Sequence, residues 1–422
     1  ISGLGAKAAQ QQEPDPMNAS GVQIDPMHRT HIAEAGERSV VPAAASFVSA
    51  REFASIPRQV AEWHGLAADC SEPNAFNEHW YLTAALAALD SQGEVELAIV
   101  RSHGRLIGLM PRFFSTSYAG LPLRSAQNWL NHNAFLGTPL VARGFERLFW
   151  QALLSELDSR PNGALFCHLT GMAVDGPVAS ALEAECYATR RQFALFHREE
   201  RALLERGLTP AAYLETTMRG KKRKELRRQQ NRLAELGQLE FQRSDGRERL
   251  DGWIAEFLAL ERRGWKGGNG SALDCADSTR SLFRGALHGA ASERKLELLA
   301  LRLDGRAIAM LINFLTPPGA FSFKTAFDED YSRFSPGVLL QIHNLALLER
   351  DGIGWCDSCA AQDHPMIDSI WSGRRAIGRY SVAIGGPVRR AAFATLLFAE
   401  KAKGRLRQIN AGKSKEANGM SS

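Results

Sequence analysis

The chain has no apolar run long enough to cross a bilayer. A membrane-spanning helix needs about 18 apolar residues in a row, and the longest candidate, residues 391–399, is roughly half that length. The first residues, with glutamines at 10–12 followed by Pro14 and Pro16, also lack the basic start and apolar core of a secretory signal. We therefore expect a cytoplasmic protein that is not integral to a membrane, with a disordered leader over residues 1–45.

Cysteine is scarce, with six irregularly spaced residues in a chain of 422. Without an export signal, such cysteines are typical of reduced thiols. Cys356 and Cys359 form a CxxC pair, but a zinc site needs two more ligands, and Cys275, His343 and His364 lack the paired spacing. We interpret the pair as thiols at the end of a strand and predict no metal site.

Several catalytic signatures are also missing. The sequence contains no GxxxxGKS/T phosphate loop, no HExxH zinc motif, no GxSxG nucleophile turn and no dinucleotide-binding fingerprint. Nucleotide hydrolysis, zinc proteolysis and serine hydrolysis therefore have no support. The composition, with 45% apolar and 23% charged residues, is ordinary for a globular protein of two domains. A net charge of +5 suits an anionic ligand or surface but does not by itself indicate nucleic acid.

Apolar periodicity divides the chain into two halves of similar outline. In the first half we predict helices over 76–89 and 145–158, and strands over 95–100, 106–110, 164–169 and 192–196. In the second half we predict helices over 211–236, 250–263, 280–291 and 338–350, and strands over 239–243, 296–303, 307–315, 321–326, 353–357 and 380–384. Tight turns at 304–306 and 317–319 make three of these strands antiparallel neighbours.

The most informative segment is the break Ser335-Pro336-Gly337 before the last predicted helix. The backbone N–H groups of Gly337, Val338 and Leu339 would have no partner inside that helix, and the helix dipole adds positive potential there. Proline loses no hydrogen bond in a first helical turn, and glycine lets an anion approach the backbone closely. The break therefore predicts a phosphate-binding turn.

Seven segments of the second half, in consistent order, resemble the GNAT acyltransferase superfamily, in the branch of CelD-like cellulose-biosynthesis proteins and Fem-type peptidyltransferases. They are 264–267 (GWKG), 303–309 (LDGRAIA), 324–329 (KTAFDE), 335–340 (SPGVLL), 357–360 (DSCA), 363–367 (DHPMI) and 371–375 (WSGRR). The resemblance covers roughly residues 200–390 and implies an α/β (α+β) fold of tandem GNAT-like domains. Each domain would be a mixed, mostly antiparallel sheet flanked by helices.

Together with the composition of the two ends of the chain, the resemblance implies four regions. These are the leader (1–45), a degenerate N-terminal GNAT-like domain (46–200), a C-terminal GNAT acyltransferase domain (201–390), and a C-terminal helix with a basic tail (391–422). It also implies that strands 321–326 and 353–357 splay apart around the thioester of acetyl-CoA or another acyl-CoA.

For the coenzyme, the candidate binding residues are Arg333, Ser335, Gly337, Val338, Leu339 and Lys324. The turn departs from the family's R/Q-x-x-G-x-G/A signature, because one extra residue precedes the glycine. An acyl carrier protein or another activated donor is therefore an alternative. For Lys324, a solvated position on a strand is the other interpretation.

GNAT-type transfer needs a base for the acceptor's proton and a backbone N–H for the oxyanion. Asp357, Asp363 and His364 form the candidate catalytic neighbourhood. Asp357 as a turn former and His364 as an ordinary loop residue are the alternative interpretations.

Four residues are candidates for binding the acceptor. Trp265 and Lys266, followed by a glycine-rich stretch, fit a loop over the acceptor or an aromatic anchor under that loop. Trp371 and Arg374 fit an anionic or sugar-like acceptor, with a surface position as the alternative for Arg374.

Residues 219–232 carry eight basic side chains against one acid, Glu225. On a helix the apolar residues around them fall on one stripe, which leaves a cationic face. The alternatives for this face are solvation, contact with a nucleotide or carrier protein, a tRNA contact, and a peripheral contact with an anionic membrane. No aromatic side chains for base stacking accompany it.

We thus predict an acyltransferase that moves an acetyl or other acyl group, without a metal, to an amine or hydroxyl acceptor. The resemblance favours a small molecule or a glycan or envelope precursor as that acceptor. The alternatives are a Fem-type aminoacyl or peptidyl transferase that uses charged tRNA, and a non-catalytic scaffold with the GNAT fold.

Overall fold

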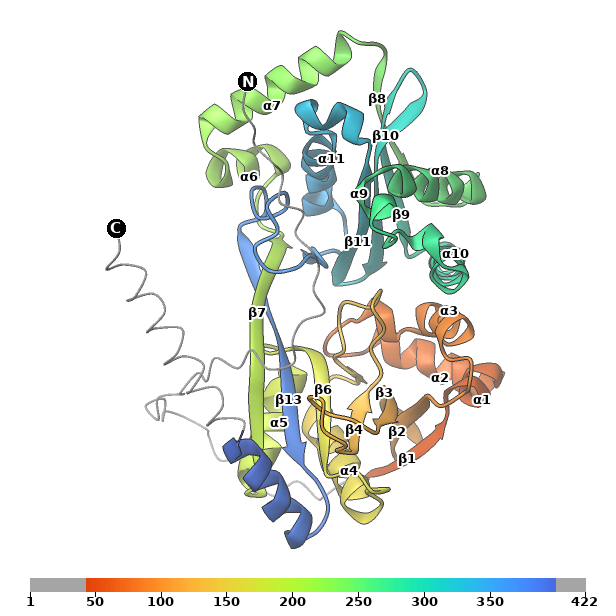
Figure 1. Cartoon of the computed structure of the whole chain (residues 1–422), viewed down its shortest axis with the longest axis vertical. Helices are drawn as coiled ribbons and strands as arrows, with labels where there is room; N and C mark the ends of the chain where they lie inside the picture. The colour runs from red at the N-terminus through yellow and green to blue at the C-terminus, as the bar shows by residue number, and fades with distance from the viewer. Residues whose placement is uncertain (1–42, 400–422) are drawn as a thin grey trace, which may run out of the picture.

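The computed structural model describes residues 43–399, whose strands form one continuous sheet with helices on its faces (Figure 1). The strand order is β1-β2-β3-β4-β6-β13-β7-β12-β11-β10-β9-β8, with β5 beside β3. Of the pairings, β4–β6 and β11–β12 are parallel and the others are antiparallel. The predicted fold class, a mixed, mostly antiparallel sheet flanked by helices, is confirmed.

The first half runs from β1 to α5. Its elements are β1 (Ala43–Ser49), α1 (Ala50–Ser55), α2 (Pro57–Ala68), α3 (His79–Leu89), β2 (Glu96–Ser102), β3 (Arg105–Ser115), β4 (Ser125–Asn128), β5 (Leu140–Val141), α4 (Glu146–Ser159), β6 (Phe166–Ala173) and α5 (Pro177–Ala188). The two helices and the first three strands predicted here overlap α3, α4, β2, β3 and β6.

The second half begins with the long strand β7. Its elements are β7 (Phe193–Glu205), α6 (Pro210–Thr217), α7 (Gly220–Ala234), β8 (Leu239–Ser244), α8 (Leu250–Arg263), α9 (Trp265–Gly268), α10 (Asp277–Ser292), β9 (Leu296–Leu303), β10 (Arg306–Thr316), β11 (Gly319–Phe327), α11 (Pro336–Asn344), β12 (Trp355–Asp357) and β13 (Gly373–Ala383). A further helix spans 387–399. None of the helices described is both long and apolar enough to span a membrane.

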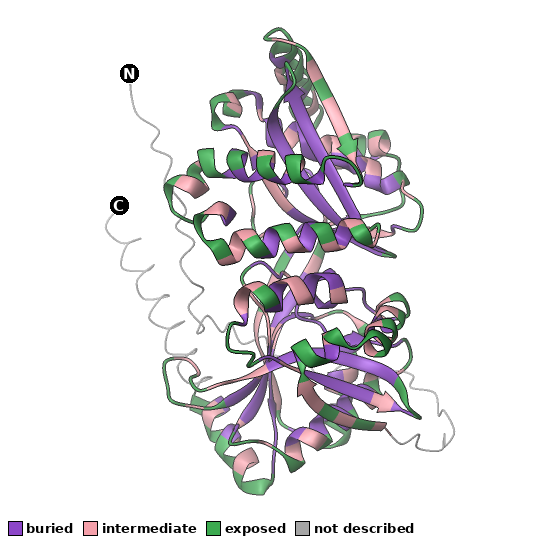
Figure 2. Cartoon of the chain, turned by 90° about the vertical axis from the view of Figure 1, so that its right-hand side faces the viewer, coloured by how far each residue is buried: buried purple, intermediate pink, exposed green. Residues whose placement is uncertain are grey.

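Turn chemistry explains why the leucine-rich β9 is a strand rather than a helix. Asp304 and Gly305 both adopt positive φ, of 49° and 79°, which is the geometry of a tight hairpin turn. The turn folds β10 back onto β9, and every residue of β9 is buried. Such burial on both faces is typical of a central strand (Figure 2).

The helix predicted over 211–236 is wrong in one respect, because the structure breaks it into α6 and α7. Met218 is extended at the break, with φ −116° and ψ 128°, and its side chain is buried. Arg223 donates to the carbonyl oxygens of Leu214 and Met218 at 3.1 and 3.0 Å, which satisfies groups that the break exposes. Gly220 next to the break lowers helix propensity further.

The two halves exchange strands. We expected 380–384 to close the second sheet, but β13 lies between β6 and β7 and pairs with both. Strand β7 pairs with β13 along most of its length and with β12 at its end. A boundary at 200 therefore falls inside β7, and both strands belong to the junction of the halves.

At the N-terminal end of the described chain, one predicted boundary differs from the structure. Residues 43–45, which we assigned to the leader, begin β1 instead. The rest of the leader and the basic tail from residue 400 onward lie outside the described residues.

Candidate functional site

Strands β11 and β12 pair over three residues only, the last being Phe321 with Asp357. A register shift against β10 leaves Phe323 bulged. After Asp357 the chain turns toward β7, where the Ser358 N–H donates to the Ala202 carbonyl at 3.1 Å. Beyond Phe321, no described strand pairs with this edge of β11, so the two strands splay apart as the resemblance implied.

A cavity of about 920 Å³ lies beside this gap, between the two halves. Residues of β11 and of the chain after β12 line one side, and residues 130, 132–135 and 170–171 of the first half line the other. Such a volume is typical of sites that enclose a small ligand. Of the residues predicted from the sequence, the cavity brings together Lys324, His364, Trp265 and Lys266.

Lys324 lies on β11 directly after the bulge. Its Nζ is 5.0 Å from the ring centre of Phe135 and 5.4 Å from that of Phe323, so the ammonium lies over aromatic faces from both halves. Burial, together with the charge of Lys266, lowers the pKa of Lys324 to about 8. The side chain is therefore mostly charged at pH 7 and gives up its proton only slightly above that pH.

His364 lines the same cavity and is half-buried. Its Nδ1 is buried and has no hydrogen-bond partner among the described residues. Burial lowers its pKa, although Asp368 acts in the opposite direction. The imidazole is thus neutral at pH 7, which is the form that accepts a proton.

Trp265 and Lys266 begin the short helix α9 at the cavity. The Trp265 N–H donates to the Glu329 carboxylate at 2.6 Å, while its side chain stays 47% exposed. Lys266 Nζ lies 2.8 Å from Oε1 of the buried Glu261. Trp265 therefore offers an aromatic surface, whereas the charge of Lys266 is already paired.

Asp357 lies behind the cavity rather than in its lining. Its Oδ2 accepts from Arg201 at 2.6 Å and from Arg375 at 3.1 Å, and its Oδ1 accepts from the Cys359 N–H at 2.9 Å. Burial raises the pKa of Asp357, but the two arginines outweigh that effect and hold it below its usual value. A buried carboxylate with these partners is a weak base, and the geometry favours a structural role for Asp357 over the predicted catalytic one.

The predicted phosphate-binding turn at the start of α11 is partly covered. Gly337 is buried, and a Cβ added there would lie 3.0 Å from Met366 Sδ. The Leu339 N–H donates to the Ser335 carbonyl at 3.0 Å, so the prediction that it is free is wrong. Only Gly337 and Val338 keep N–H groups in the unpaired first turn of the helix. Neither they nor the exposed Arg333 line the cavity.

Three other predicted residues also lie outside the cavity lining. Trp371 is fully buried in the core of the second half, because the chain before β13 packs inward there. Arg374 is exposed and donates to the Trp371 and Gly373 carbonyl oxygens, each at 2.8 Å. Asp363 is exposed on its loop.

A comparison with protein families matches one part of the chain. Residues 220–364 match the family model of the acetyltransferase (GNAT) domain. The matched residues lie wholly within the second half, from the start of α7 to the chain after β12. A search of curated proteins finds no match.

Several solved structures align with most of the chain. FemX has a TM-score of 0.52 at 10% identity, covering 76% of this chain and 95% of its own. A conserved protein of unknown function from Bacteroides thetaiotaomicron has a TM-score of 0.49 at 14% identity, covering 77% and 97%. A tandem GNAT protein from the clavulanic acid biosynthesis pathway has a TM-score of 0.41 at 17% identity, covering 81% and 99%. At such identities the likeness to FemX concerns the fold alone.

The sequence analysis missed cavity residues that come from β7 and from the first half. Arg201 and Glu199 come from β7, and Phe135 comes from the first half. Arg201 donates to the Phe135 carbonyl at 2.6 Å as well as to Asp357, so it ties the halves together under the cavity. Glu199 lies 3.2 Å from His197 Nε2. No local motif marks these residues.

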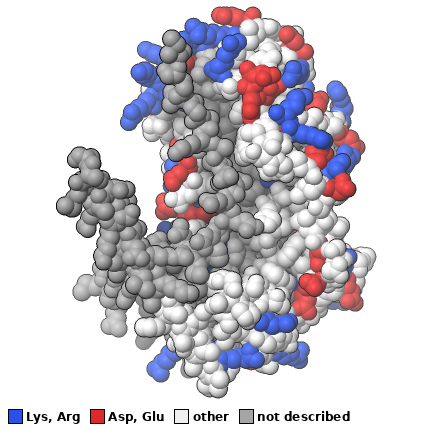
Figure 3. Space-filling model, in the orientation of Figure 1, with Lys and Arg blue, Asp and Glu red and all other residues white. Residues whose placement is uncertain are grey.

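The basic helix α7 lies on the outer surface of the second half, where Lys and Arg side chains gather (Figure 3). Leu226 and Leu233 are buried beneath it, as the stripe predicted. A second cavity, of about 300 Å³, lies between α7, β8 and α11 and includes Arg223 and Arg227 in its lining.

Proposed function

We propose that the protein transfers an acyl group from acyl-CoA, with acetyl-CoA as the first candidate, to an amine or hydroxyl acceptor in the cavity between its halves. The observation that carries this proposal is the open β11–β12 junction beside a cavity of about 920 Å³. Beyond Phe321, no described strand pairs with that edge of β11, so a thioester can bind along it. The family resemblance adds a small molecule or a glycan or envelope precursor as the acceptor.

In the proposed reaction, the acceptor nitrogen or oxygen attacks the thioester carbonyl. The new C–N or C–O bond forms, the C–S bond breaks, and the acceptor's proton passes to the neutral His364. The charged Lys324 attracts the oxyanion and then supplies the proton that the leaving thiolate takes up. The proton on His364 returns to Lys324 through water.

The coenzyme's phosphates would reach the start of α11. Gly337 and Val338 present N–H groups there, and Arg333 lies exposed two residues before Ser335. Met366 covers Gly337, but an unbranched thioether side chain moves readily. Acyl-CoA binding should therefore displace Met366.

Filling the gap tests the proposal. Ala360 follows β12 and lines the cavity, so Ala360→Trp should obstruct the donor and weaken acetyl-CoA binding by at least about tenfold in isothermal titration. Ala184→Trp, on the exposed face of α5, is the matched control and should bind as the unaltered protein does. Equal affinity in both variants, with unchanged circular dichroism, would refute the donor site.

The exposed basic face of α7 favours a second candidate, a transferase whose donor is charged tRNA. A hydrolysis-resistant charged-tRNA analogue that competes with acetyl-CoA would favour this candidate. Absence of RNA binding at low salt would remove it. The non-catalytic scaffold would be favoured if no acyl-CoA or acyl carrier bound at all.

A further inference from the structure

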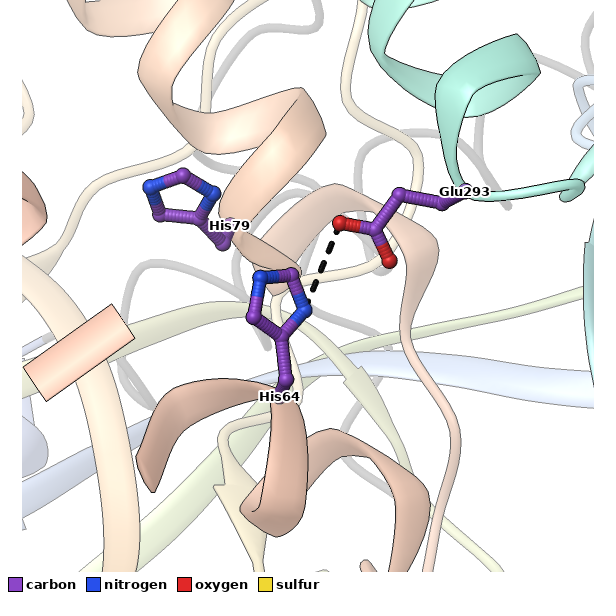
Figure 4. Close-up of side chains that lie close together, drawn as sticks. All are labelled: His64, His79 and Glu293. Carbon is purple, nitrogen blue, oxygen red and sulfur yellow. Dashed lines mark ion pairs between the residues drawn. The ribbon is translucent and has the colours of Figure 1, made fainter. Parts of the chain in front are cut away.

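Away from the cavity, three side chains capable of binding a metal converge where the halves meet (Figure 4). His64 comes from α2, His79 begins α3, and Glu293 follows α10. One ligand atom from each lies within 4.8 Å of the others. His64 Nδ1 is 3.3 Å from Glu293 Oε1, and the two imidazole centres are 5.3 Å apart.

His79 is oriented as a ligand would be. Its Nε2 lies 3.3 Å from the Ala54 carbonyl oxygen, which can only accept, so Nε2 carries the hydrogen and Nδ1 keeps a lone pair. A hydrogen bond from the far nitrogen to a backbone carbonyl is the usual support of a metal-binding histidine. Trp63 packs edge-on against the ring at 5.4 Å and limits its rotation.

The charges around Glu293 leave one oxygen of its carboxylate available to bind a metal ion. Lys295 Nζ lies 3.4 Å from Glu293 Oε2, but it also pairs with the buried Glu78. The lysine charge is thus balanced by Glu78, and Glu293 Oε1 faces His64. The His64 side chain is 37% exposed, so an ion can enter from solvent.

The frame around these side chains is closely packed. Helices α3 and α10 touch through small residues, and a Cβ added at Gly289 would lie 2.9 Å from the Trp80 carbonyl oxygen. Ligand atoms bound to one zinc ion lie about 3.3 Å apart, whereas these three lie within 4.8 Å of one another. Because the helices are closely packed, rotation of the three side chains has to close this difference.

We propose that His64, His79 and Glu293 bind one transition-metal ion of the zinc class, with a water molecule in the fourth position. Two imidazoles and one carboxylate are a ligand set that suits zinc. Because Glu293 belongs to the second half and both histidines to the first, the ion links the halves on the side of α3 and α10.

Zinc titration of the full chain, first treated with a chelator, tests this site. We expect one equivalent to bind and to raise the unfolding temperature, because binding to the folded state alone stabilises it. His64→Gln and Glu293→Gln should each weaken zinc binding by at least about tenfold. His288→Gln, an exposed histidine of α10, is the matched control and should not change it.

Cobalt(II) provides an independent measurement. Bound at three protein ligands and water, it should give the intense visible absorption of a tetrahedral site, and His64→Gln should abolish that absorption. His64 is partly exposed, so this variant should fold. Absence of binding, or binding that His64→Gln and Glu293→Gln leave unchanged, would overturn the proposal and leave an ion pair between His64 and Glu293.

Discussion

The two parallel strand junctions of this protein differ beyond their last paired residues. In the first half, β4 and β6 pair over two residues, and Asn128 then bridges the strands. Its Oδ1 accepts from the Thr170 N–H and its Nδ2 donates to the Thr170 carbonyl, both at 2.8 Å, and Nδ2 also reaches the Gly137 carbonyl at 3.1 Å. In the second half no side chain of this kind joins β11 to the described chain after β12.

This difference between the β4–β6 and β11–β12 junctions indicates which half of the protein can bind a thioester. The amide of Asn128 occupies the backbone groups that a donor would need, so the first junction is closed. The second junction keeps those groups available beside Lys324 and the cavity. We infer that the first half forms a wall of the site and does not carry a second site of the same kind.

Removing the proposed base at the open junction should have the largest effect. We expect His364→Gln to lower kcat by about 10²–10⁴, the usual contribution of a positioned base. Acetyl-CoA affinity should change little, because the proton is transferred only during reaction. His288→Gln serves as control, and an unchanged kcat in His364→Gln would remove His364 from the mechanism.

Asp357 supports the open junction from behind, so Asp357→Asn should act on stability. Leaving Arg201 and Arg375 without their buried partner should cost about 3–5 kcal/mol of unfolding free energy, measured by denaturant titration. Because the pKa of Asp357 is lowered, its contribution is present above the unfolded-state pKa and is lost as pH falls through the folded-state pKa. Asp363→Asn, at an exposed carboxylate nearby, should change stability by less than about 0.5 kcal/mol. A fully stable Asp357→Asn with low turnover would restore the catalytic role.

Local signals predicted the elements well wherever turns were clear. Helix α8 and strand β9 have the bounds expected from the sequence, since polar turn residues flank their apolar patterns. The partners of β13 were not predictable in this way. Its apolar pattern fits an inner strand in either half of the sheet, and its pairing with β6 depends on contacts about 200 residues away in sequence.

The sequence predicted only part of the candidate site, because some of its residues are brought together by contacts between distant segments. Lys324 and His364 lie in segments that resemble the family, and both line the cavity. Trp371 lies in such a segment too, yet it is a core residue, because an aromatic side chain suits a core as well as a ligand. Phe135 and Arg201 carry no local signal, since the fold alone brings them to the cavity.

A substitution at Asn128 tests whether the closed β4–β6 junction takes part in the reaction. Asn128→Ala removes three buried hydrogen bonds, and we expect a loss of about 1–3 kcal/mol in unfolding free energy because backbone groups are left unpaired. Turnover at 25 °C should stay unchanged if only the second junction is active. Asn231→Ala, on the exposed face of α7, is the control for stability. A strong loss of activity in a folded Asn128→Ala protein would mean that the first half takes part in the reaction.

The pH dependence of turnover is the sharpest test of the chemistry, and it concerns Lys324. Its pKa of about 8 means that rising pH removes the proton and the charge, so kcat should fall above that value by about tenfold per pH unit. We call this fall of kcat above about pH 8 the alkaline limb of the pH profile. Lys324→Gln should lower activity at pH 7 and remove the alkaline limb. Lys221→Gln, at an exposed lysine of α7, should leave the alkaline limb unchanged. An alkaline limb that persists in Lys324→Gln would mean that another group titrates there.

The low pKa of Lys324 depends on burial beside Phe135 and Phe323. Phe135→Ala should therefore raise this pKa and move the alkaline limb to higher pH. Such a shift would link the first half, which supplies Phe135, to the chemistry of the second half.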